Sequence, residues 1–257
     1  MHFITLKKKN LLAWLGLISL LIVLISLNAV VGAAGVYLTG TAPRKLPIYC
    51  VDTQEKKVAI TFDAAWGADK TDELISILKE NNVKATFFLV GFWAEKYSDK
   101  VKALDENGFE IGTHSNTHPN MANLSRAKMQ LELEASINIL QNITGKRPTL
   151  FRPPYGAYNN ALIETAESLG LKTIQWDVDS LDWKDYSAQD IAQRVISRTQ
   201  NGSIILMHNN GANTPQALKL IILGLKNKGF DFVCVSELIY HDDYYIDHTG
   251  RQIKNSR

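Results

Sequence analysis

The feature that most constrains the fold is a regular alternation of short apolar runs with longer amphipathic stretches from Lys57 onward. The short runs are rich in β-branched and aromatic residues, as expected of strands. They occupy residues 58–62, 85–90, 109–112, 150–151, 173–178, 203–207 and 230–235. About seven such alternations indicate an α/β fold of parallel strands covered by helices, either a barrel or an open doubly wound sheet. Periodicity does not choose between these two architectures.

The stretches between the strands carry apolar residues at helical spacing and have typical helix boundaries. Thr71, Ser125 and Ser187 each precede such a stretch and are predicted to cap a helix N-terminus. Gly170 and Gly229 follow two others, where helix C-termini favour glycine. In both candidate architectures, ligands bind at the carboxyl ends of the strands. Chemistry is therefore predicted in the loops that follow the strands.

Successive strand ends carry ionisable side chains. In chain order these are Asp63, His114 and His118, Arg152, Asp177, Asp179 and Asp182, and His208. Each has an ordinary explanation, such as a helix cap, a surface ion pair, an acidic turn or a core histidine. Their meeting at one rim favours a functional site. His114 and His118 are four residues apart, and two imidazoles at this spacing can bind one ion such as zinc.

These residues form five short motifs that resemble, in order, those of the polysaccharide deacetylase family, the NodB-homology domain of carbohydrate esterase family 4. The motifs are Thr61-Phe62-Asp63, residues 114–118, Arg152-Pro153-Pro154-Tyr155, residues 179–183 and Leu206-Met207-His208. The resemblance covers about residues 57–238. It implies a distorted (β/α)7 barrel and a metal-dependent hydrolase that removes N-acetyl groups from the amino sugars of a polysaccharide.

The resemblance also implies roles for individual residues. His114 and His118 match the metal ligands, Asp63 the general base and His208 the general acid. The supporting residues are Arg152, which matches the residue that orients the base; Asp182, which matches the one that holds this arginine; Tyr155, whose backbone N–H matches an oxyanion donor; and Leu206, which shapes the acetyl pocket. Trp66 lies beside the first motif and Trp183 ends the fourth, and both are predicted to stack on sugar rings.

The first motif departs from the family pattern at Ala64. The family usually has a second aspartate there, which completes the metal site, and a methyl group cannot bind a cation. Two protein ligands remain where a catalytic zinc site normally has three. The missing third ligand leaves three alternatives. Water or the substrate completes the metal site, Asp69 replaces the missing aspartate as a ligand, or the domain binds glycan as a pseudoenzyme without hydrolysing it. Because the other motifs are intact, an active N-deacetylase with zinc, or cobalt or nickel instead, is predicted; hydrolysis of an acetyl ester is a further alternative.

Residues 64–67, Ala-Ala-Trp-Gly, together with the apolar N-terminus resemble the PdaB-type branch associated with spore-forming bacteria. This resemblance implies a role in sporulation and peptidoglycan as the polysaccharide substrate, with chitin-like oligomers as an alternative. A net charge of +2, without a basic run beyond Lys7, Lys8 and Lys9, argues against nucleic acid as a partner. The protein is predicted to be a monomer. Pairing of Cys50 with Cys234 stays open.

Residues 11–38 carry no charge and follow three lysines, so they are predicted to be an uncleaved transmembrane signal anchor. The small residues 31–35 resemble a cleavage site, so a cleaved signal peptide is the alternative. The lysines place residues 1–10 in the cytoplasm and the remainder outside. The predicted product is a single-pass cell-membrane protein with an extracytoplasmic catalytic domain. After the anchor, the expected segments are a linker (39–56), the deacetylase domain (57–240) and a polar tail (241–257).

Overall fold

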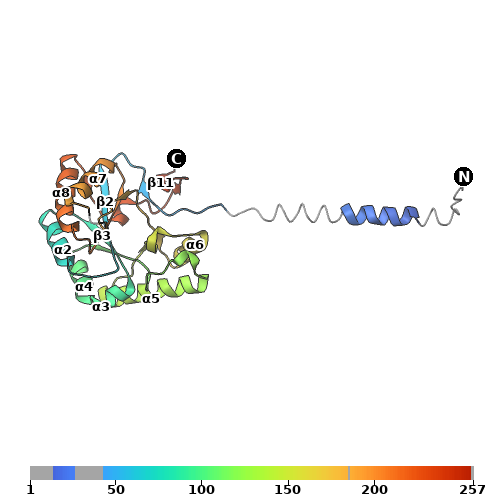
Figure 1. Ribbon diagram of the computed structural model, residues 1–257, viewed down its shortest axis with the longest axis horizontal. Helices are drawn as coiled ribbons and strands as arrows, with labels where there is room; N and C mark the ends of the chain where they lie inside the picture. Colours follow the sequence, from blue (N-terminus) through green and yellow to red (C-terminus); the bar gives the residue numbers. More distant parts are fainter. Residues whose placement is uncertain (1–13, 27–42, 185, 256–257) are drawn as a thin grey trace. The chain divides into compact units, whose positions relative to one another are not determined.

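The protein is described by a computed structural model, which covers residues 14–26, 43–184 and 186–255. The chain divides into two compact units, Met1–Arg44 and Lys45–Arg257. In the first unit, residues 14–26 form a helix whose side chains are exposed. The second unit contains the elements described below (Figure 1).

The predicted membrane location is corrected by the structure. Within residues 14–26, 43–184 and 186–255, no helix has both the length and the apolar character needed to cross a membrane. The remainder of the predicted anchor, residues 11–13 and 27–38, lies outside the described residues, as does the predicted cytoplasmic segment 1–10.

A parallel sheet forms the centre of the second unit. Its strand order is β6-β5-β4-β3-β2-β8-β7, with β9 paired to β2. The strands are β2 (Lys57–Ala64), β3 (Ala85–Leu89), β4 (Glu110–Thr113), β5 (Leu150–Phe151), β6 (Lys172–Thr173), β7 (Val178–Asp179), β8 (Ile204–His208) and β9 (Asp231–Phe232). The register places Asp63, the second-last residue of β2, opposite His208, the last residue of β8. Thr113 pairs with Phe151, so His114 and Arg152 leave the sheet at the same level.

The two edge strands of the sheet are consecutive in the chain. Residues 173–178, predicted as one strand, form β6 and β7 with a break between them. Ile48 fills this break: its N–H donates to Thr173 O (3.0 Å), and its carbonyl accepts from Gln175 N–H (2.7 Å). Among the described pairings, β6 and β7 do not join each other. The α/β class with parallel strands is therefore confirmed, but the described strands form a half-barrel in which β6 and β7 are not paired with each other.

Helices cover the strands because each has one apolar face. They are α2 (Thr71–Glu80), α3 (Gly91–Lys96), α4 (Ser98–Glu106), α5 (Arg126–Thr144), α6 (Asn160–Ser168), α7 (Ala188–Arg198), α8 (Thr214–Asn227) and α9 (Val235–Leu238), with 3-10 turns η1 (Met121–Asn123) and η2 (Pro154–Gly156). In Figure 1, α2, α4, α5 and α8 lie around β2 and β3. Leu218, Ile221 and Leu225 of α8 are fully buried in the largest core cluster.

The predicted helix caps are confirmed at two of three positions. The side chain of Ser125 accepts the N–H of Lys128, and that of Ser187 accepts the N–H of Asp190. Thr71 is instead the first residue of α2, and its buried hydroxyl has no hydrogen-bond partner. The cap prediction at Thr71 is therefore wrong, because the helix begins one residue earlier than the cap position requires.

A second, small sheet joins the segments that the sequence assigns to the linker and the tail. Its order is β1 (Cys50–Val51), β11 (Arg251–Lys254) and β10 (Tyr244–Ile246). Gln252 of β11 is buried, and its amide exchanges two hydrogen bonds with the backbone of Tyr240 at 2.7 and 2.8 Å. Residues 45–56 of the predicted linker and residues 241–255 of the predicted tail thus belong to the second unit. Cys50 and Cys234 are buried free thiols.

Candidate functional site

A cavity of about 800 Å³ opens at the carboxyl ends of the strands, where the sequence predicts the site. It is lined by Asp63, Ala65, Trp66, His114, His118, Tyr155, Trp176, Asp179, Trp183, Leu206, His208 and residues 209–212. Two predicted site residues, Arg152 and Asp182, do not line the cavity. Both are buried, and each contacts a residue that lines it.

Asp63 is held by Arg152 from behind the cavity. Arg152 Nη1 donates to Asp63 Oδ1 (2.8 Å) and to Thr61 Oγ1 (2.8 Å), and Nη2 donates to Gln175 O (3.1 Å). The guanidinium carbon lies 4.1 Å from the centre of the Phe88 ring. Burial alone would raise the pKa of Asp63, but the charge of Arg152 and its hydrogen bond hold the pKa below its usual value. Asp63 is therefore a carboxylate near neutral pH.

The two histidines of the second motif lie side by side. His114 Nδ1–H donates to Arg152 O (2.7 Å), which leaves Nε2 as an acceptor 3.5 Å from Asp63 Oδ2. The His118 ring lies edge-on to His114, with ring centres 4.9 Å apart, and within 4.7 Å of both Trp66 and Tyr155. Burial lowers the pKa of His114 and lowers that of His118 to about 4. Both imidazoles are thus neutral near pH 7, the form that binds metals.

His208 is paired with Asp182 on the other side of Asp63. His208 Nδ1–H donates to Asp182 Oδ1 (2.7 Å), and Asp182 Oδ2 accepts the backbone N–H of His208 (2.9 Å) and the hydroxyl of Thr214 (2.7 Å). Burial lowers the pKa of His208, but its hydrogen bond to Asp182 and the charge of Asp182 together raise it above its ordinary value. His208 can therefore carry a proton near neutral pH.

The predicted role of Asp182 is corrected by this contact. The sequence assigns Asp182 to Arg152, but the described hydrogen bonds of the Asp182 carboxylate go to His208 and Thr214. The physical reason is topological. Asp182 follows β7, which pairs with β8 and His208, whereas Arg152 follows β5 at the other side of the half-barrel.

Strained backbone gathers around the cavity. Ser115, His118, Tyr155 and Leu181 have φ of 70°, 57°, 60° and 56°, and they are four of the six described non-glycine residues with positive φ. Such conformations cost of order 1–3 kcal/mol each and persist only where the surroundings impose them, often at functional sites.

Among the residues that the structure describes, the cavity lacks a third protein ligand for a metal ion. Ala64 is fully buried in the largest apolar core cluster and does not line the cavity. Asp69, the possible substitute, is exposed and also does not line it. The described residues contain no group of three or more metal-ligating side chains. Two nitrogen donors nevertheless fit a cation, because His114 has a free Nε2 and His118 Nδ1 is buried without a hydrogen-bond partner.

Sequence reasoning missed several residues that complete the site. Asn209 Nδ2 donates to Gly67 O (2.8 Å), and Asn210 lies where any side chain at Gly67 would collide with it. Gln175, in the break between β6 and β7, donates to Gly156 O (2.9 Å) and so supports the turn that carries Tyr155. The signal for Asn209 and Asn210 is their place directly after His208. Gln175 lies inside an apolar run that showed no break.

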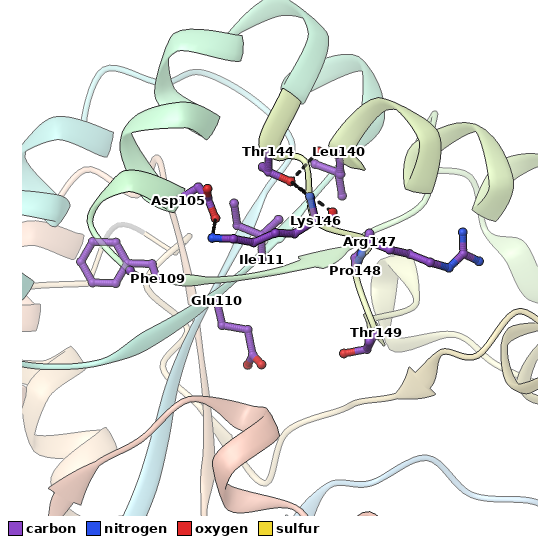
Figure 2. Close-up of a pocket in the computed structure, with 11 residues that line it drawn as sticks. Asp105, Phe109, Glu110, Ile111, Leu140, Thr144, Lys146, Arg147, Pro148 and Thr149 are labelled. Atoms are coloured by element: carbon purple, nitrogen blue, oxygen red, sulfur yellow. Dashed lines mark hydrogen bonds and ion pairs between the residues drawn. The ribbon is translucent and has the colours of Figure 1, made fainter. Parts of the chain in front are cut away.

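A smaller hollow of about 270 Å³ lies at the amino ends of β4 and β5, whereas the large cavity lies at the carboxyl ends of the strands (Figure 2). Lys146 Nζ donates to Asp105 Oδ1 (2.7 Å). Figure 2 shows this contact, and it shows Arg147 pointing away from the other labelled side chains. Arg147 Nη2 donates to Leu169 O (3.0 Å). Both cations that line this hollow are therefore engaged in structural contacts, and the chemistry-bearing residues lie in the larger cavity.

Comparisons with known proteins agree with the motifs. A sequence profile of the polysaccharide deacetylase family matches residues 51–174. A peptidoglycan-N-acetylglucosamine deacetylase of Bacillus cereus is 36% identical over 186 residues, which cover 71% of this chain and 68% of the relative. The uncharacterized protein YlxY of Bacillus subtilis is 33% identical over 75% of this chain, which spans 60% of YlxY.

A solved structure also matches the fold. A family 4 carbohydrate esterase pseudoenzyme from Bacillus anthracis superposes with a TM-score of 0.73 and 34% identity, over 75% of this chain and 68% of that one. A mutant of the same pseudoenzyme is described as having restored enzymatic activity. The motifs, the half-barrel and these similarities together show that this chain belongs to the polysaccharide deacetylase family.

Proposed function

We propose that this protein hydrolyses the N-acetyl groups of amino sugars in a cell-wall polysaccharide. The observation that carries the proposal is the pairing of Asp63 with His208 across neighbouring strands. One is a carboxylate with a lowered pKa and the other an imidazole with a raised pKa. A base and an acid that face one cavity at the same pH are what amide hydrolysis requires.

In the proposed reaction, water attacks the acetyl carbonyl carbon and Asp63 accepts the water proton. A C–O bond forms, and the carbonyl electrons move to oxygen, where the backbone N–H of Tyr155 would stabilise the negative charge in the role that the family resemblance implies. The C–N bond then breaks as His208 Nε2 gives its proton to the leaving nitrogen. The products are acetate and a free amino sugar, and Arg152 keeps Asp63 aimed and ionised.

A divalent cation, which we propose to be zinc, with cobalt or nickel as alternatives, would be held by His114 and His118. It would polarise the acetyl carbonyl and lower the pKa of water. The Arg152 carbonyl orients His114 for this role, as outer-shell acceptors commonly do for ligating histidines.

The exposed aromatic residues at the cavity rim support a polysaccharide substrate. Trp66, Tyr155 and Trp183 are 57–68% exposed, which is unusual for large aromatic side chains that are not engaged by a ligand. Together with the relatives named as peptidoglycan deacetylases, this rim favours peptidoglycan, with chitin-like oligomers as the alternative. The sporulation setting, the monomeric state and the domain limits stay predictions from the sequence.

A second candidate function is glycan binding without hydrolysis. Ala64 favours glycan binding without hydrolysis, because alanine has no carboxylate at the position where the family pattern has an aspartate. Ala64 is instead buried in the apolar core. The solved pseudoenzyme of the same family shows that this fold exists without activity.

The test is acetate release from peptidoglycan and from chitin oligomers by the full chain, with and without zinc. Asp63→Asn and His208→Ala serve as catalytic controls. Release that needs both residues and stops on chelation would establish the deacetylase. Absence of release with every metal, together with retained oligomer binding, would establish the glycan-binding protein.

A further inference from the structure

The loop between the two histidines is held by one carboxylate from outside the cavity. Glu132 of α5 accepts the N–H groups of Asn116 (3.0 Å) and Thr117 (2.8 Å) with Oε2, and the Thr117 hydroxyl (2.7 Å) with Oε1. We propose that Glu132 is a positioning residue that sets the orientation of His114 and His118. As far as catalysis is concerned, this role rests on the proposed deacetylase function.

The opposite side of the loop is bound by the start of α3. The N–H of Gly91 donates to Ser115 O (2.9 Å), and that of Phe92 donates to Asn116 O (3.1 Å). A Cβ at Gly91 would lie 2.2 Å from Asn116 Oδ1 and 3.1 Å from Asn116 Cα, so the start of α3 and the loop approach each other closely. The first N–H groups of a helix have no partner within the helix and readily bind carbonyls. The loop is therefore held between a helix N-terminus, which binds its carbonyls, and Glu132, which binds its amides.

The loop needs this support because its backbone is strained. Ser115 and His118 flank the two amides that Glu132 accepts, and both adopt left-handed φ values, 70° and 57°. Side chains with a Cβ avoid this region unless the surroundings impose it. Hydrogen bonds to a carboxylate are about twice as strong as neutral ones, so three of them on two adjacent residues are a strong restraint.

Helix α5 also contacts the residue that precedes His114. Ser136 Oγ lies 2.5 Å from Thr113 Oγ1. Glu132 and Ser136 are four residues apart and so lie on the same face of α5. This face thus contacts the chain immediately before His114 and again between the two histidines. A single helix controls both imidazoles, although neither of its two side chains lines the cavity.

The variants that test the proposal are Glu132→Ala, Glu132→Gln and the matched control Glu134→Gln. Glu134 lies on the same helix, and its side chain contacts Gln130 (2.8 Å) instead of the loop. In Glu132→Gln, the amide oxygen can accept the N–H groups of Asn116 and Thr117, and the amide NH2 can donate to the Thr117 hydroxyl oxygen. All three hydrogen bonds are then kept, so Glu132→Gln should behave like the wild type. Alanine removes every bond. Ser136→Ala is a milder second variant, should Glu132→Ala fail to fold.

The primary readout is the imidazole NMR signals of the full chain without metal. In Glu132→Ala, the His114 and His118 signals should broaden or split, while that of His208, across the cavity, stays unchanged. If the wild type releases acetate, kcat should fall roughly 10–100-fold with KM within about threefold, and Glu132→Gln should stay within about threefold of wild type. Ser136→Ala should perturb His114 more than His118.

Unchanged His118 signals in folded Glu132→Ala would overturn the proposal, as would equal effects of Glu132→Ala and Glu134→Gln. A wild type without acetate release would refute the proposed function alone, because the NMR readout needs neither turnover nor metal.

Discussion

Substitution of Arg152 by methionine tests how the structure keeps Asp63 ionised. Arg152 is fully buried and Asp63 is 7% exposed, so the change would leave a carboxylate buried beside neutral imidazoles. Removing one member of a buried ion pair typically costs about 3–5 kcal/mol. Because whole domains are stable by about 5–15 kcal/mol, this loss is large but measurable. We expect Arg152→Met to lower the free energy of unfolding by about 3–5 kcal/mol at pH 7.

The pH dependence gives the prediction its sign. In the wild type, the pKa of folded Asp63 lies below its unfolded value, so the stabilisation is present above the unfolded pKa and is lost as pH falls through the folded pKa. Without Arg152, burial dominates and the folded pKa lies above the unfolded one. Asp63 then destabilises the protein at neutral pH and ceases to do so as it gains a proton. The difference between variant and wild type should therefore narrow from pH 7 to about pH 4.5.

Urea unfolding followed by tryptophan fluorescence at the two pH values measures this difference. The double variant Asp63→Asn with Arg152→Met is the control, because it removes both charges. It should recover about 2 kcal/mol relative to Arg152→Met at pH 7, and its difference from wild type should change less with pH. A cost below about 1 kcal/mol, or one that is the same at both pH values, would refute the view that Arg152 holds Asp63 ionised.

Three further predictions concern the same cavity. Asp182→Asn leaves burial as the main influence on His208 and lowers its pKa, so the alkaline limb of the rate of acetate release against pH should move down by about one unit or more. His114→Ala and His118→Ala should each weaken zinc binding at least about tenfold in calorimetric titration, whereas equal affinity would place the ion elsewhere. Ala64→Asp should lower the stability of the metal-free protein by about 3 kcal/mol in thermal unfolding, because Ala64 packs in the core; an unchanged melting temperature would mean that the new carboxylate reaches solvent.

Local signals in the sequence predicted most of the central fold. Ser125 and Ser187 cap their helices because a cap depends on residues two or three positions away. The break between β6 and β7 was not predictable in this way. It depends on Ile48, which lies more than a hundred residues earlier and occupies the gap. The pairing of β1 with β11 is likewise a contact between the two ends of the folded unit.

The location of the site was predictable from the sequence, but the contacts between its residues were not. Parallel strands bring all their carboxyl ends to one rim, so Asp63, His114 and His208 had to converge. Which buried partner each receives depends on strand order, which periodicity does not contain. The Asp182 carboxylate therefore accepts a hydrogen bond from His208 and not, as predicted from the sequence, from Arg152. The contact of Glu132 with the histidine loop was hidden for the same reason, since Glu132 lies in a helix that otherwise reads as amphipathic.

The assignment of base and acid follows from the charge that lies behind each residue. Arg152 and Asp182 are both buried, and each pairs with one side chain that lines the cavity. A cation behind Asp63 favours the deprotonated carboxylate, and an anion behind His208 favours the protonated imidazole. If the buried charges of Arg152 and Asp182 were exchanged, the protonated form of Asp63 and the neutral form of His208 would be favoured. Asp63 could then not act as the base, and His208 could not act as the acid. The proposed hydrolysis therefore has a working range that begins at the lowered pKa of Asp63 and ends at the raised pKa of His208.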